Sequence, residues 1–240
     1  MDLSSYILMV FEGEVTEKDI FDNLKQYYLT DNPSTIIYGF HCGEIYSLYN
    51  KMEKDCDLEL FGILKETLGS KNPELLTINQ SDIQEINLFF DYDGHAASAE
   101  YTKLELMLEH FNNETENGKL YISYPMVEAI RHLKSSVNFK DTIAKSEKAY
   151  KLLTLQNCDD CYKNLSDLSK NDWGKIISEH CRKLGFILYN RFEFPNDAIK
   201  QLEIFKKQKE NYIDKHNQVA VLSAFPIFLT DYYGYEIFKD

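Results

Sequence analysis

Four short apolar runs recur along the chain, and each is followed by a segment with helical periodicity. The runs read as buried strands and cover residues 6–11, 35–40, 86–90 and 119–123. Strands that alternate with helices build βαβ units, whose parallel sheet is covered by helices on both faces. The sequence therefore predicts an α/β fold, with a parallel sheet flanked by helices.

The segments after these runs predict the covering helices. The first begins with Thr16 as N-cap and Asp19 as the acid at N3, and the second runs in pieces from Glu44 to Leu68. Leu104, Met107, Leu108 and Phe111 mark the third, and Pro125 suits the first position of the fourth. Further helices are predicted over 141–156, 171–189 and 195–216, while the apolar run 219–229 fits a strand or a helix. We expect an α/β domain over residues 1–138 and a mainly helical region over 139–240.

Acidic residues directly follow two of the four apolar runs. Glu12 and Glu14 flank Gly13 after the first run, and Asp91 and Asp93 follow the third. Parallel strands end at one edge of a sheet, and crowded carboxylates are costly there unless a cation neutralises them. The alternatives are that Glu14 and Glu17 favour a helix N-terminus, and that an ordinary Asp-Gly turn follows the strand. The two clusters together predict a divalent-metal site of Glu12, Asp91 and Asp93.

A third polar segment follows the fourth run. Glu128 and Arg131 would share one face of a helix that begins near the carboxylates, although an intrahelical ion pair explains them equally. His95 follows the second acidic cluster and either orients a phosphate or water, or is an exposed loop histidine. For Cys158 and Cys161, structural thiols are favoured over a zinc site, because His180 and Cys181 point apart on a helix.

Three segments carry a family resemblance: YILMVFEGEVTEKDIF, INLFFDYDGH and LYISYPMVEAIRHL. Over residues 5–135 they resemble a TOPRIM domain of the phage-defence branch, which includes RloB-like proteins, relatives of OLD-family nucleases and the effector of PARIS-type systems. Glu12 matches the glutamate after strand one, and Asp91 and Asp93 match the DxD after strand three. The branch's EGExTE matches Glu12, Glu14 and Glu17, and its Ser-x-Pro-x-x-Glu matches Ser123, Pro125 and Glu128. The attached ATPase domain of OLD proteins is absent.

The resemblance implies a nuclease that depends on Mg²⁺ or Mn²⁺. Glu12, Asp91 and Asp93 would hold the cation, Glu14 or Glu17 would support a second ion or act as base, and Glu128 would complete the catalytic set. His95 and Arg131 would bind substrate. Hydrolysis is favoured over strand joining, since no tyrosine stands in a nucleophile context. The implied biology is an abortive-infection toxin that cuts tRNA or DNA beside a separate partner ATPase.

The composition of the chain bears on its binding to nucleic acid, the state of its cysteines and its location. The net charge of −13 argues against unaided adhesion to nucleic acid. Five scattered cysteines and an N-terminus without signal-peptide features predict reduced thiols and a cytoplasmic protein, and no apolar run is long enough for a membrane span. A homo-oligomer stays open. The alternative function is a non-catalytic acidic TOPRIM-like module that binds an ATPase or senses a phage protein.

Overall fold

The computed structural model describes residues 5–29, 35–43, 45–54, 59–92 and 98–239. It has an α/β architecture with a mostly parallel central sheet flanked by helices, as predicted. The strand order is β2-β1-β3-β5-β4, and a separate two-stranded sheet pairs β6 with β7. The strands are β1 (Ser5–Phe11), β2 (Thr35–His41), β3 (Ile83–Asp91), β4 (Asn112–Asn113), β5 (Gly118–Ser123), β6 (Ile143–Ala144) and β7 (Val219–Ala220).

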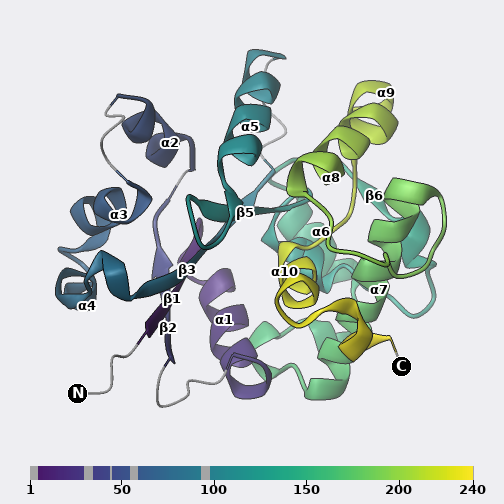
Figure 1. The fold of residues 1–240 in the computed structure, drawn as a ribbon. Coiled ribbons are helices and arrows are strands. Elements are labelled where there is room, and N and C mark those ends of the chain that lie inside the picture. The colour runs from purple at the N-terminus through teal and green to yellow at the C-terminus, as the bar shows by residue number, and fades with distance from the viewer. Residues whose placement is uncertain (1–4, 30–34, 44, 55–58, 93–97, 240) are drawn as a thin grey trace. The chain divides into compact units, whose positions relative to one another are not determined.

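The α-helices alternate with the strands of the central sheet and then dominate the C-terminal part (Figure 1). They are α1 (Thr16–Tyr27), α2 (Ile45–Lys54), α3 (Leu60–Leu68), α4 (Pro73–Thr77), α5 (Ser98–His110), α6 (Tyr150–Asn157), α7 (Lys170–Tyr189), α8 (Gln201–Gln208), α9 (Asp214–His216) and α10 (Ala224–Tyr233). A π-helical segment, η6 (Lys209–Ile213), joins α8 to α9. Short 3₁₀ turns connect other elements, among them η2 (Val127–Arg131) and η3 (Phe139–Asp141).

The chain forms two compact units. The first comprises residues 1–90 and 106–120, and the second comprises residues 91–105 and 121–240. The chain passes from one unit to the other within β3, α5 and β5. The predicted domain boundary at residue 138 stays a prediction.

In the first unit, β1 is the central strand. It pairs in parallel with β2 on one side, where Phe11 lies opposite His41, and with β3 on the other, where Phe11 lies opposite Phe89. Because the chain leaves β1 in one direction for β2 and returns to the other side for β3, right-handed crossovers put α1 and α2–α4 on opposite faces. Figure 1 shows this arrangement. The carboxyl ends of β1 and β3 thus form a topological switch point, the usual ligand position in such sheets.

In the second unit, α7 is the central helix. A capping box of Ser169 and Asp172 fixes its start, and its buried face includes Trp173 and Cys181. The α10 helix packs against it, with the Cys181 Sγ 3.9 Å from the Pro226 carbonyl. The strands of the small sheet are antiparallel and pair Ile143 with Ala220.

Several predicted elements are wrong. The helix expected from Pro125 is only the 3₁₀ turn η2, in which the Ala129 and His132 N–H groups donate to carbonyls three residues earlier. Residues 142–149 are not helical, since Ile143 and Ala144 pair with β7. The N-cap of α1 is Val15 rather than Thr16, and it makes no side-chain cap. The helix predicted from residue 195 begins at Gln201.

Other predictions are confirmed or resolved. The helix predicted over 171–189 is α7, and the run 219–229 contains both of its alternatives, the strand β7 followed by α10. Within the described part of the chain, no helix is both long and apolar enough to cross a membrane.

Candidate functional site

The tip of β1 is held by backbone hydrogen bonds from both sides. The Cys42 N–H donates to the Phe11 carbonyl at 2.9 Å, and the Glu12 N–H donates to the Phe89 carbonyl at 3.1 Å. The backbone of Glu12 is therefore fixed as an extension of the sheet, and its side chain is half-buried. A carboxylate at this position lies at the end of the central strand of the first unit.

Gly13 and Glu17 form a tight contact just beyond this tip. The Gly13 N–H donates to Glu17 Oε1 at 2.8 Å, and the Glu17 side chain is buried. A Cβ on Gly13 would lie 2.6 Å from that oxygen, so only glycine leaves room for the carboxylate. The backbone of Gly13 does not adopt a positive φ, and the glycine is required for space rather than for conformation. Glu17 thus closes the loop between β1 and α1.

Glu14 differs from Glu17 in its surroundings. Its side chain is 65% exposed, and its Oε1 lies 3.3 Å from Nε2 of His41 at the end of β2. Cys42 follows His41, and the pKa of its thiol is raised to about 11, first by burial and then by the negative charge of Glu12. The thiol therefore stays protonated at neutral pH and is a poor nucleophile. Three acidic side chains surround this loop, and only Glu14 is well exposed.

In the second unit, the structure connects two of the predicted motifs. Asp91 is the last residue of β3, and its Oδ1 accepts the Val127 N–H at 2.7 Å. The bond joins the Asp91 carboxylate to the turn that carries Glu128. In addition, the Tyr92 N–H donates to the Ser123 carbonyl at 2.9 Å. The first aspartate of the DxD motif and the Ser-x-Pro-x-x-Glu motif therefore belong to one local structure.

Glu128 is buried, and its charge is balanced by a lysine that sequence reasoning missed. Lys151 Nζ lies 3.1 Å from Glu128 Oε1, and the lysine side chain is 60% exposed. The adjacent Tyr150 is also buried, and its pKa is raised well above 10 by burial and by the charges of Glu128 and Asp91. Its hydroxyl lies 3.0 Å from Nδ1 of His132, whose pKa burial lowers to about 4. No spacing in the sequence relates Tyr150 and Lys151 to these motifs.

The other predicted residues fall into two groups. Arg131 is buried and donates from its guanidinium to the Lys163 carbonyl at 2.7 Å, while the Ser123 hydroxyl accepts the Ala224 N–H at 3.2 Å. Asp93 and His95 lie outside the described residues. The roles predicted for Arg131, Asp93 and His95 stay predictions.

The donor chemistry of Glu12 and Asp91 suits a hard divalent cation, because carboxylate oxygens are the ligands that Mg²⁺ prefers. Among the residues that the structure describes, no group of three or more histidine, cysteine, aspartate or glutamate side chains could hold a metal ion. Asp93, the third predicted ligand, is not among these residues. The thiols of Cys158, Cys161 and Cys181 are free, and His180 accepts the Ser223 N–H on its Nδ1 at 3.0 Å.

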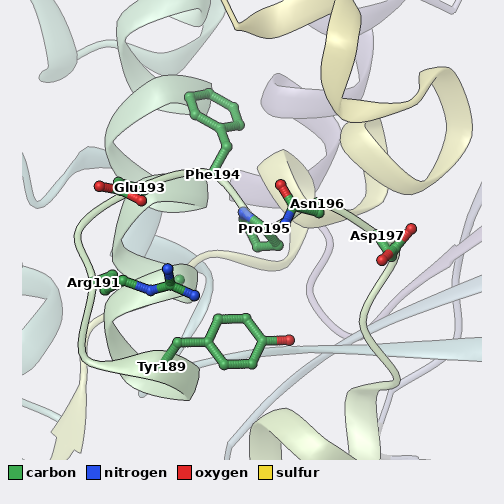
Figure 2. A pocket seen from close by; sticks show the side chains of 8 residues that line it. Tyr189, Arg191, Glu193, Phe194, Pro195, Asn196 and Asp197 are labelled. Carbon is green, nitrogen blue, oxygen red and sulfur yellow. The ribbon is translucent and has the colours of Figure 1, made fainter.

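A small hollow of about 150 Å³ lies at the C-terminal end of α7. It forms where the chain turns at Asn190 and returns over Gly185, whose missing side chain lets the Glu193 carbonyl approach. Figure 2 shows Tyr189 and Arg191 below Pro195, while the ring of Phe194 points away from these two side chains. None of the residues predicted from the sequence lines this hollow.

No protein-family model matches the chain, and no curated protein or solved structure is significantly similar to it.

Proposed function

We propose that the protein is a metal-dependent nuclease, which hydrolyses phosphodiester bonds with Mg²⁺ or Mn²⁺. The observation that supports this proposal is the parallel pairing of β1 with β3. Phe11 lies opposite Phe89, and each strand then runs into a carboxylate, Glu12 after β1 and Asp91 at the end of β3. The ends of neighbouring parallel strands at a switch point are where a sheet of this order presents ligands.

In the proposal, Glu12, Asp91 and Asp93 hold the cation. A bound cation of this type polarises a phosphate and lowers the pKa of a bound water, which is the chemistry that hydrolysis needs. Tyr150 stays protonated because of its raised pKa, which makes it a poor nucleophile and favours hydrolysis over strand joining.

Glu14 and Glu17 differ in their surroundings, and this difference supports a choice between them for the base or second-ion role. Glu17 is buried and its carboxylate is held by the Gly13 N–H, so its contribution is to fix the loop after β1. Glu14 is largely exposed and lies beside His41, which leaves it accessible to water and substrate. We therefore assign the role to Glu14. Glu128, balanced by Lys151, fixes the turn whose N–H binds Asp91.

The family resemblance and the net charge support a proposal for the substrate and the partner. The net charge of −13 opposes broad, sequence-independent adhesion to phosphates, which supports recruitment of DNA or tRNA through a local site, a metal and a partner. The proposed partner is a separate ATPase, and the proposed role is an abortive-infection toxin. Co-expression with and without a neighbouring ATPase gene, with growth as the readout, tests this part.

Cleavage by the purified protein tests the enzymatic part. We expect wild type to cut tRNA or DNA with Mn²⁺ or Mg²⁺ and not with EDTA. Glu12→Gln and Asp91→Asn should each abolish cleavage, and the asparagine keeps the oxygen that binds the Val127 N–H. Glu116→Gln removes the same charge from an exposed turn and should cleave like wild type. If wild type cleaves neither nucleic acid in the presence of its partner, or both site variants stay active, the proposal is wrong.

A further inference from the structure

A second cavity, of about 270 Å³, lies in the second unit beside Tyr92, the residue that follows Asp91. Its walls are two loops at one end of the small sheet. Lys145, Ser146 and Glu147 follow β6, and Asn217 precedes β7. The cavity is distinct from the carboxylates of the proposed metal site, and none of the roles described above uses it.

The floor of this cavity is apolar, whereas its rim is polar. Ile213 and Val219 are buried beneath it. On the rim, the side chains of Lys145, Asn217 and Gln218 form no hydrogen bond or ion pair with the other described residues. Polar groups that line a cavity without protein partners are available to a ligand. The rim therefore offers one cation, Lys145, two carboxamides and the carboxylate of Glu147 above an apolar surface.

The backbone around the cavity contains a left-handed residue and the end of a π-helical segment. Asn217 has a φ of 52°, in the left-handed region that asparagine tolerates better than most residues. Ile213 ends the π-helical segment η6, and π-segments inside helices are frequent at functional sites. Ser146 donates from its hydroxyl to the Tyr92 carbonyl at 3.0 Å, which ties the β6 loop to the chain directly after Asp91. The cavity is thus anchored to the end of β3.

We propose that this cavity holds one nucleotide of the substrate, next to the phosphate that is cut. Its volume of about 270 Å³ lies just below the roughly 300–1,000 Å³ typical of ligand pockets, which suits a ligand no larger than a single nucleotide. Asn217 and Gln218 carry the carboxamide groups that pair with base edges, adenine above all. Lys145 supplies a charge for a neighbouring phosphate. This inference rests on the proposed function, because it assumes that the substrate is a nucleic acid that reaches Asp91.

Binding of a labelled oligoadenylate in EDTA tests the inference separately from catalysis. The probe is a fluorescein-labelled single strand of about eight nucleotides, within the site sizes known for single-strand binders. Fluorescence anisotropy gives its Kd for wild type and for two variants. Asn217→Gly removes the carboxamide and keeps the left-handed backbone, and Lys145→Ala removes the charge. We expect each variant to raise the Kd about tenfold, which corresponds to ~1.4 kcal/mol.

Two matched variants serve as controls. Asn190→Gly makes the same change at the other left-handed asparagine, and Lys148→Ala removes an exposed lysine of the same loop that does not line the cavity. Both should bind like wild type. The inference is overturned if wild type does not bind the probe, or if the cavity variants bind as tightly as the controls. Absence of cleavage with Mn²⁺ would instead contradict the proposed function, while selective loss of binding in the cavity variants would still support a nucleotide site.

Discussion

Replacing Gly13 by alanine should destabilise the first unit, because the new methyl group takes the place of the Glu17 carboxylate. The added Cβ would lie 2.6 Å from Oε1 and 2.8 Å from Cδ of Glu17, closer than such atoms pack. The carboxylate must therefore move, and its 2.8 Å hydrogen bond from the Gly13 N–H is lost. A hydrogen bond to a charged group contributes about 1.5–3 kcal/mol, which is the loss in unfolding free energy that we expect.

A double-mutant cycle separates this cause from a general effect of the substitution. Glu17→Ala removes the carboxylate and should cost a similar ~1.5–3 kcal/mol. With the carboxylate gone, the added methyl group meets open space, so Gly13→Ala in the Glu17→Ala background should change stability by less than about 0.5 kcal/mol. Urea unfolding followed by far-UV circular dichroism measures all four proteins. Additive losses in the double mutant, or a neutral Gly13→Ala, would refute the reasoning.

Gly174 provides the matched control for the same substitution. It lies inside α7, and a Cβ there would have no atom within 4 Å. Alanine is favoured over glycine in a helix interior by ~1 kcal/mol, so Gly174→Ala should raise stability by up to that amount. The fluorescence of the single, buried Trp173 reports the unfolding of the second unit in the same titrations.

Two further predictions concern groups with shifted pKa values. Burial lowers the pKa of His180 to about 3, so only the unfolded chain takes up this proton between pH 6.5 and 3. The free energy of unfolding should therefore decrease as the pH is lowered from 6.5 to 3, by at most ~5 kcal/mol. His180→Asn keeps an acceptor for the Ser223 N–H and should flatten the slope of urea midpoints against pH. An unchanged slope would contradict this. Glu12→Gln should lower the raised pKa of the Cys42 thiol and speed its alkylation by iodoacetamide at pH 8, measured by peptide mass spectrometry. An unaltered rate would show that the Glu12 carboxylate does not lie close to this thiol.

The sequence predicts those elements of the fold whose apolar pattern is local. The runs at β1, β2 and β5 and the periodicity of α7 are visible without any distant contact. The errors occur where distant partners decide the conformation. Residues 143–144 form a strand by pairing with β7, and the turn after Pro125 is joined by a hydrogen bond to Asp91, 36 residues earlier in the chain.

In the candidate site, too, the features with a local sequence pattern could be predicted, and those that depend on distant contacts could not. Glu12 and Asp91 could be singled out because strand ends are recognisable in a sequence. The Glu128 segment was expected to begin near these carboxylates because it also follows a strand. The balance of Glu128 by Lys151 could not be predicted, because nothing in the local pattern around residue 151 marks it. The close contact at position 13 also depends on where the Glu17 side chain lies, which no local pattern in the sequence shows.

The central claim is that Glu12 and Asp91 hold one divalent cation, and titration with Mn²⁺ tests it most directly. Isothermal titration calorimetry should find a Mn²⁺ site in wild type and in Glu116→Gln. The same site should be lost in both Glu12→Gln and Asp91→Asn, because ligands of one cation act together. Retention of wild-type Mn²⁺ affinity in either variant would contradict the claim.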